Sequence, residues 1–109
     1  MILYHGTRYP NSIINSRQIN IAKTGYRCVS LTSNYEIAKY FASLQRDDDE
    51  GFGAVFVFSK DKLEKLYDIV PFADPGASRN EYEFQIWQDL SFDTIPRPLR
   101  SVEFLEDTK

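Results

Sequence analysis

The chain has 109 residues, of which 42% are hydrophobic and 27% are charged, and its net charge is −3. This length suits one domain with its own hydrophobic core, so we expect a single domain over residues 1–109, and the composition excludes a disordered chain. One cysteine and one histidine exclude an intrachain disulfide and a metal site built on cysteine or histidine, so no metal is expected. The acidic balance disfavours tight, non-specific binding to nucleic acid.

The first half of the chain predicts two strands and two helices. Residues 2–5 form a short hydrophobic strand, and residues 11–17 predict a short helix. A second strand is expected over residues 28–32. The helix after it has the clearest signal, because Ser33-Asn34-Tyr35-Glu36 has the form of a capping box with Ser33 at the N-cap. Apolar side chains then recur at helical spacing, at Ile37, Ala38, Phe41, Ala42 and Leu44.

The second half consists mainly of predicted strands. Residues 54–58 are a continuous apolar run, which is typical of a central strand buried on both faces. A short helix or turn over residues 60–66 precedes a strand over residues 67–70, which we expect the following proline to stop. Residues 81–87 alternate in polarity and predict another strand. With a last strand over residues 101–105, the chain is expected to be α+β.

Two strands end in residues that can bind a ligand. In Tyr4-His5-Gly6-Thr7, a strand that ends in His-Gly can aim an imidazole at a ligand while the glycine lets the backbone come close. Ser30 and Thr32 lie on one face of their strand because strands have a two-residue period. Taken alone, each motif is better explained structurally, by a hydrogen-bonded strand-end histidine and by hydroxyl pairing between strands.

A pair of acids and one tyrosine complete the candidate residues. Glu81 and Glu83 share a strand face, and a carboxylate there can stabilise the positive charge that develops on a sugar during glycosidic cleavage. The alternative is a solvated edge strand, which Gln85 and Trp87 on the same face disfavour. Tyr40 can stack on a flat heteroaromatic group, although a single helix tyrosine is more often half-buried with its hydroxyl in water.

The order of these motifs resembles the ADP-ribosyltransferase superfamily. Tyr4-His5-Gly6-Thr7 looks like the opening motif of the diphtheria-toxin-like branch, and residues 29–40 are similar to the strand and helix under the nicotinamide in that branch. Glu81-Tyr82-Glu83 looks like the Glu-x-Glu strand of the arginine-, serine- and glutamate-marked branch, in which the second acid is catalytic. The resemblance implies a split β-sandwich of two small sheets with a few short helices, and NAD+ in the cleft between the sheets.

The resemblance also implies which residues bind NAD+. His5 would contact the ribose on the adenosine side. The backbone of Gly6, supported by Thr7, would hold the nicotinamide carboxamide. Tyr40 would stack on the nicotinamide ring. The remaining residues expected at the NAD+ site are Tyr4, Ser30 and Thr32.

The catalytic roles fall to the acid pair. Glu83 would hydrogen-bond the nicotinamide ribose and stabilise the oxocarbenium-like state as nicotinamide leaves. Ser30 would help to position Glu83, and Glu81 would orient or deprotonate the acceptor. The Glu-x-Glu motif identifies the pair of acids more firmly than it identifies which of the two is catalytic. Glu81 is therefore also a candidate for the catalytic acid.

The function implied by the resemblance is that of a mono-ADP-ribosyltransferase acting on a macromolecular acceptor, with protein slightly favoured over nucleic acid. We expect a cytoplasmic protein without membrane association, because the sequence shows no signal peptide and no stretch of membrane-spanning length. These features fit a bacterial toxin or phage-encoded effector, for which an antitoxin or immunity protein is a further candidate partner. Two alternatives stay open: an RNA 2′-phosphotransferase, which Ser30 and Glu83 disfavour, and an inactive binding or inhibitor module of the same fold.

Overall fold

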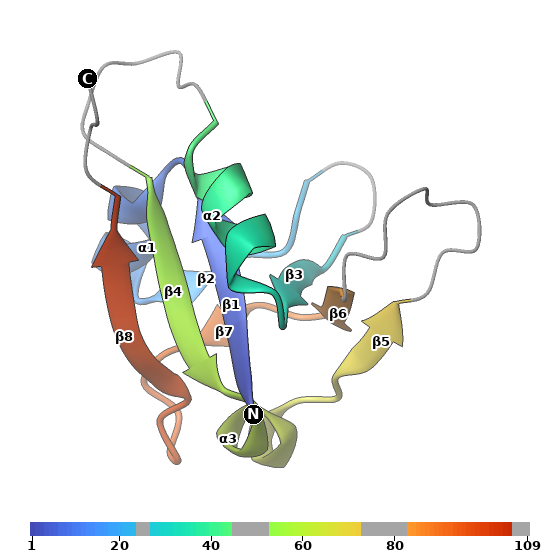
Figure 1. Cartoon of the computed structure of the whole chain (residues 1–109). Coiled ribbons are helices and arrows are strands. Elements are labelled where there is room, and N and C mark those ends of the chain that lie inside the picture. The colour runs from blue at the N-terminus through green and yellow to red at the C-terminus, as the bar shows by residue number, and fades with distance from the viewer. Residues whose placement is uncertain (24–26, 45–52, 73–82, 106–109) are drawn as a thin grey trace.

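The computed structural model describes residues 1–23, 27–44, 53–72 and 83–105, which form an α+β arrangement of eight strands and three helices. Six antiparallel strands make the main sheet, in the order β5-β6-β3-β1-β4-β8 (Figure 1). Their bounds are β1 Ile2–Thr7, β3 Val29–Thr32, β4 Ala54–Ser59, β5 Val70–Phe72, β6 Glu83–Ile86 and β8 Leu99–Phe104. The other elements are the two-stranded sheet of β2 (Gln18–Ile19) and β7 (Leu90–Ser91), and the helices α1 (Pro10–Ser16), α2 (Tyr35–Ala42) and α3 (Lys60–Leu66).

The main sheet has two halves that meet at a single position. Strand β1 pairs with β4 along its whole length, and β3 pairs with β6 along its whole length. Between β1 and β3, in contrast, the register consists of the one pair Tyr4 and Thr32. Beyond that pair the two strands diverge, and the half formed by β8, β4 and β1 turns away from the half formed by β3, β6 and β5 (Figure 1).

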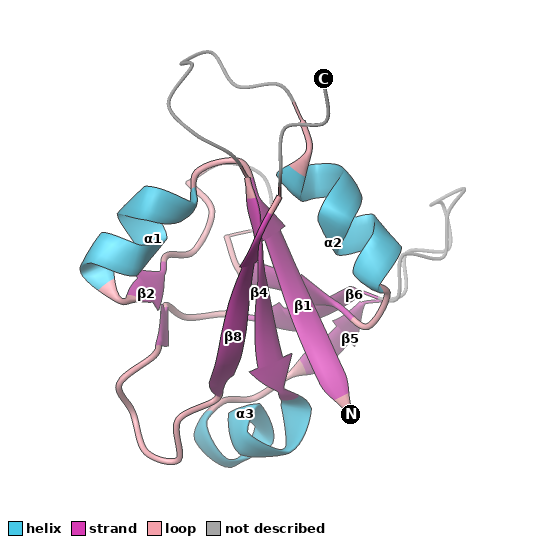
Figure 2. Cartoon of the chain, turned by 60° about the vertical axis from the view of Figure 1, so that its left-hand side comes forward, coloured by secondary structure: helices cyan, strands magenta, loops and turns pink. Residues whose placement is uncertain are grey.

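The two faces of the sheet are packed differently. One face carries the main core, in which the buried rings of Phe56 and Phe58 contact Phe92 at centroid distances of 5.8 and 6.0 Å. The other face of the β1–β4 half is covered by α2 (Figure 2). The helix comes so close that an ideal Cβ at Gly6 would lie 1.8 Å from the Ala38 carbonyl oxygen. Glycine is therefore required at this position by the close approach of α2.

Most of the predicted elements are confirmed, and three details differ. The N-cap of α2 is Asn34 and not Ser33, because the Asn34 side chain accepts a hydrogen bond from the Glu36 N–H at 3.0 Å, and asparagine caps as well as serine. The helix ends at Ala42, earlier than its apolar spacing suggests. The strand expected over residues 67–70 is wrong, because β5 spans Val70–Phe72 and so contains Pro71. A proline is tolerated there because β5 is at the edge of the sheet that the described strands form.

Candidate functional site

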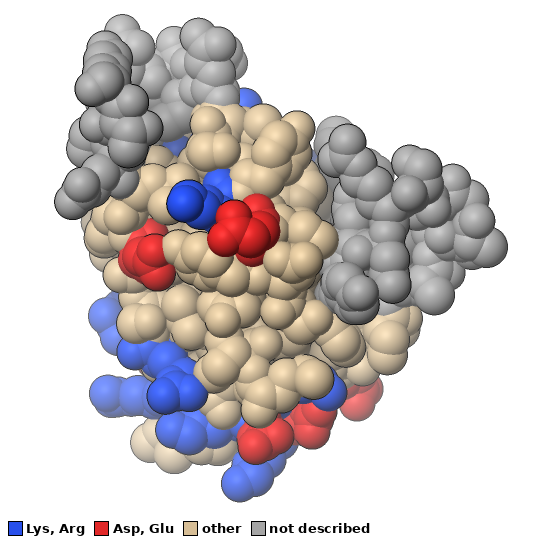
Figure 3. Space-filling model, in the orientation of Figure 1, with Lys and Arg blue, Asp and Glu red and all other residues tan. Residues whose placement is uncertain are grey.

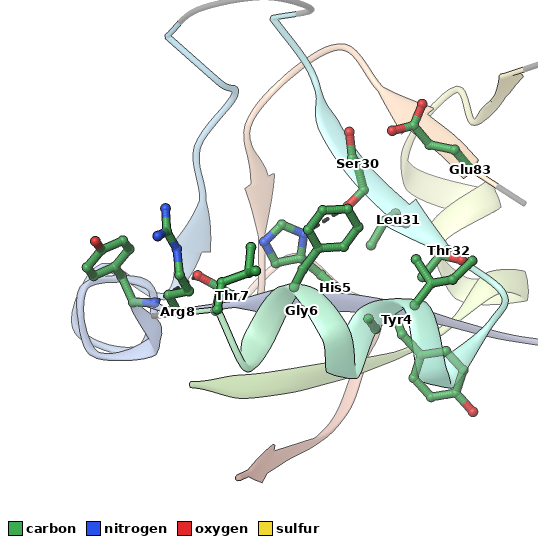
Figure 4. A pocket seen from close by; sticks show the side chains of 14 residues that line it. Tyr4, His5, Gly6, Thr7, Arg8, Ser30, Leu31, Thr32 and Glu83 are labelled. Atoms are coloured by element: carbon green, nitrogen blue, oxygen red, sulfur yellow. Dashed lines mark hydrogen bonds between the residues drawn. The ribbon is translucent and has the colours of Figure 1, made fainter. Parts of the chain in front are cut away.

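A cavity of ≈ 510 Å³ opens where β1 and β3 diverge (Figure 4). It receives side chains from the end of β1, from β3 and from the start of β6, and α2 forms one of its walls. Seven of the residues predicted from the sequence line it: Tyr4, His5, Gly6, Thr7, Ser30, Thr32 and Glu83. Tyr40 is not among the lining residues, and Glu81 lies outside the described residues.

Strand register explains how residues far apart in sequence meet here. Tyr4 on β1 is the partner of Thr32 on β3, and Thr32 is in turn the partner of Glu83 on β6. Residues paired across neighbouring strands point to the same face of a sheet. The three side chains therefore form a row on the face that α2 covers, and the row ends with the Glu83 carboxylate at the cavity.

His5 bridges the gap between the diverging strands. Its Nδ1 lies 2.8 Å from the carbonyl oxygen of Ser30 (Figure 4). Because a carbonyl can only accept, Nδ1 carries the proton and donates, which leaves Nε2 of the neutral ring as an acceptor. Burial lowers the pKa of His5 below the usual 6.5, and the hydrogen bond to Ser30 opposes this only in part. The ring is therefore neutral near pH 7, with Nε2 able to accept a hydrogen bond from a ligand hydroxyl.

Several of the lining residues also hold the local structure. The Thr7 hydroxyl accepts a hydrogen bond from the Tyr9 N–H at 3.0 Å and so shapes the turn between β1 and α1. The Thr32 hydroxyl accepts from the Asn34 N–H, also at 3.0 Å, at the start of α2. The Tyr4 ring packs edge-on against Tyr35, 5.5 Å away. These contacts fix the rim of the cavity.

The Glu83 carboxylate has a partner that the sequence analysis did not assign. Its Oε2 accepts a hydrogen bond from Nε2 of Gln85 at 3.2 Å, and Gln85 is buried. The Ser30 hydroxyl extends in the same direction as Glu83 (Figure 4), and it lies 3.9 Å from the sulfur of Cys28. The expected role of Ser30 in positioning Glu83 stays a prediction. The alternation of residues 81–87 already placed Gln85 on the same face as Glu83, which is the signal that pointed to it.

The aromatic ring that α2 contributes to the cavity is Phe41, which sequence analysis named only among the apolar residues at helical spacing. Ile37, Phe41 and Leu44 line the cavity with Ala38, at the i, i+4, i+7 spacing of one helix face. Tyr40 lies on a neighbouring face, where it is 53% exposed and touches Phe41 edge-on at 5.5 Å. The helical spacing of the apolar residues was the available signal for Phe41.

A second cavity, of ≈ 620 Å³, continues the first on the other side of His5. The two cavities share His5, Thr7, Tyr9 and Ser30. Hydroxyl and amide side chains from α1 and the segment around β2 line the second one, at Ser12, Ser16, Gln18 and Asn20. Apolar residues also line the second cavity, at Ile13, Ile19, Ala22, Cys28 and Val29. Together the two cavities form a crevice that runs from Glu83 and Phe41 to the hydroxyl and amide side chains near α1, a shape that suits an elongated ligand.

In the described part of the chain, no three histidine, cysteine, aspartate or glutamate side chains gather in a way that could hold a metal ion. None of the helices described is both long enough and apolar enough to cross a membrane. Comparison with protein-family models, with curated proteins and with solved structures found no match.

Proposed function

We propose that the chain is a mono-ADP-ribosyltransferase that binds NAD+ in the crevice between β1 and β3. The observation that carries this proposal is the set of seven residues around the first cavity. Three segments that are far apart in sequence supply the His-Gly-Thr end of β1, the Ser-x-Thr strand and the glutamate that the family resemblance requires, and they meet around one cavity. The six strands form one sheet and not two small ones, but the pair Tyr4 and Thr32 alone joins β1 to β3, which supports the split arrangement that the resemblance implies.

The shape of the crevice supports a dinucleotide as the ligand. The volume of each of its two cavities falls in the range of ligand sites, about 300–1,000 Å³, and both cavities are lined by His5. The acceptor Nε2 of His5 suits a ribose hydroxyl. Phe41, and not Tyr40, takes the stacking position beside the nicotinamide in this proposal, because Phe41 lines the cavity that also contains Glu83.

The proposed reaction begins with cleavage of the bond between the ribose C1′ and the nicotinamide nitrogen. The bonding pair stays with nicotinamide, which leaves as a neutral ring, and positive charge develops on the ribose. The Glu83 carboxylate stabilises that charge and accepts a hydrogen bond from a ribose hydroxyl. A nucleophile of the acceptor then forms the new bond at C1′, and Glu81 is assigned to orient or deprotonate that nucleophile.

We place a protein ahead of nucleic acid as the acceptor, because the net charge of −3 weakens attraction to phosphates. Lysine and arginine side chains nevertheless gather on the lower left of the surface, near the lower end of β8, whereas at α3 they alternate with acidic side chains (Figure 3). Nucleic acid is therefore kept as the second acceptor class. A bacterial toxin or phage effector, countered by an antitoxin or immunity protein, is the proposed context.

The test is nicotinamide release from NAD+ by the wild type, by Glu83→Gln and by Glu64→Gln. Removing one group that stabilises transition-state charge costs about a hundredfold or more in rate, and we expect that loss for Glu83→Gln. Glu64 is exposed on α3 and serves as the matched control with wild-type activity. An inert wild type favours the inactive module, and an unimpaired Glu83→Gln removes Glu83 from the chemistry.

The acceptor class is found by incubating labelled NAD+ and a cell lysate with the protein, followed by separate protease and nuclease digestion. Label that only protease removes identifies a protein acceptor, and label that only nuclease removes identifies nucleic acid. Transfer of the phosphate from a 2′-phosphorylated RNA to NAD+ would instead support the 2′-phosphotransferase.

A further inference from the structure

Gln85 lies on β6, the second strand from one edge of the main sheet, and is buried although its side chain is polar. It is 3% exposed, and Thr32, at 7%, is the other buried polar side chain in the described part of the chain. A buried amide costs free energy unless its donors and acceptor are hydrogen-bonded. The hydroxyl of Thr32 accepts a hydrogen bond from the Asn34 N–H at the start of α2. The side chain of Gln85 instead hydrogen-bonds Glu83, the candidate catalytic acid.

The hydrogen bond between Gln85 and Glu83 has a fixed direction. Nε2 of Gln85 lies 3.2 Å from Oε2 of Glu83. A carboxylate only accepts hydrogen bonds, so the amide must present its NH₂ group to Glu83. Hydrogen bonds to an ionised acceptor are stronger than those between neutral groups. The contact therefore fixes one oxygen of the carboxylate.

The donor is itself held firmly by the sheet. Strand β6 has a partner on both sides, and at this level of the sheet Gln85 lies between Ser30 on β3 and Val70 on β5. Glu83 and Gln85 are two residues apart on one strand and so project from the same face. Glu83 lines the cavity, whereas Gln85 is not among the lining residues. Gln85 thus contacts the Glu83 carboxylate from outside the cavity and does not reach a ligand in it.

We propose that Gln85 is a positioning residue that holds Oε2 of Glu83 and leaves the other carboxylate oxygen for the ribose of NAD+. This inference rests on the proposed function, because it gives Gln85 a role only if Glu83 stabilises the reacting ribose. Apart from Glu83 itself, the cavity residues proposed to bind NAD+ are untouched when Gln85 changes. Loss of the amide therefore lowers kcat and leaves KM nearly unchanged.

The experiment compares Gln85→Met with Gln88→Met. Methionine has nearly the length of glutamine but lacks the N–H donor, and Gln88 is an exposed glutamine three residues further along. Misplacement of a reacting group by 1 Å costs about a hundredfold, so we expect kcat of Gln85→Met to fall about ten- to a hundredfold. The KM for NAD+ stays within about twofold, and Gln88→Met matches the wild type in both constants.

A double-mutant cycle separates positioning from a merely structural role. In the Glu83→Gln background, Gln85→Met should cause no further loss of rate, because its effect passes through the carboxylate that is already missing. An equal loss in both backgrounds overturns the proposal. So does a folded Gln85→Met with the kcat of the wild type, or one in which KM alone rises.

A second variant covers the case in which Gln85→Met does not fold. Gln85→Asn keeps a buried amide but withdraws it from Glu83 by one methylene, and the same loss of kcat is expected. If neither variant folds, the role of Gln85 is to stabilise the fold, and the proposal is overturned. An inert wild type refutes the proposed function itself, and a fully active Glu83→Gln removes Glu83 from the chemistry together with the role of Gln85. An inactive Glu83→Gln with a fully active, folded Gln85→Met refutes the positioning role alone.

Discussion

Replacing Gly6 with alanine tests how α2 is seated on the sheet. An ideal Cβ at Gly6 would lie 1.8 Å from the carbonyl oxygen of Ala38 and 2.6 Å from its carbonyl carbon. Both are backbone atoms of α2, so rotation of a side chain cannot relieve the overlap. To accept the methyl group, the helix must withdraw until the 1.8 Å contact reaches the 3.4 Å of ordinary van der Waals contact.

Two effects of opposite sign decide the stability of Gly6→Ala. Alanine in place of glycine at an unstrained strand position stabilises by about 0.5–1 kcal/mol, because the unfolded chain loses less entropy on folding. Overpacking a tight contact costs about 1–3 kcal/mol. Because the obstacle here is backbone, we expect a net loss of about 1–2 kcal/mol, and each 1 kcal/mol lowers Tm by about 4–8 °C in a domain of this size.

Thermal unfolding followed by circular dichroism measures this loss. Gly53→Ala should behave alike, because a Cβ there would lie 1.8 Å from the carbonyl oxygen of Ala42 on the same helix. Ser101→Ala, at an exposed strand position of β8, is the control and should change stability by less than about 0.5 kcal/mol. A Tm of Gly6→Ala at or above that of the wild type would refute the close seating of α2.

Two further predictions concern the cavity. Phe41→Ala should raise the Kd for NAD+ about tenfold in calorimetric titration, because an aromatic wall of the cavity is lost. Tyr40→Ala should leave the Kd within about twofold of the wild type. The opposite order of the two Kd values would return the stacking role to Tyr40. The lowered pKa of His5 predicts that folding stability falls as the pH drops below 6.5, because the unfolded chain then binds a proton that the folded chain does not. Urea unfolding midpoints between about pH 8 and about pH 5 should show this loss in the wild type and less of it in His5→Gln, and an unchanged pH dependence would exclude His5 as its source.

Local sequence patterns predicted the elements that depend on neighbouring residues. The apolar run from residue 54 gave the central strand β4, which is paired on both sides by β1 and β8. The helical spacing after residue 36 predicted α2, although its cap is Asn34. The small sheet of β2 and β7 was not anticipated, because each of its strands is two residues long and depends on a partner about seventy residues away.

The sequence by itself determined which chemical groups are available and on which face of their strands they lie. Alternation placed Glu83 and Gln85 on one strand face, and the same two-residue period placed Ser30 with Thr32. The tertiary structure decided what these groups meet: β1 and β3 separate after one pair, His5 bridges the opening to Ser30, and Phe41 faces the cavity in place of Tyr40. The physical reason is that strand register and helix rotation depend on hydrogen bonds and packing between distant segments, which local periodicity does not encode.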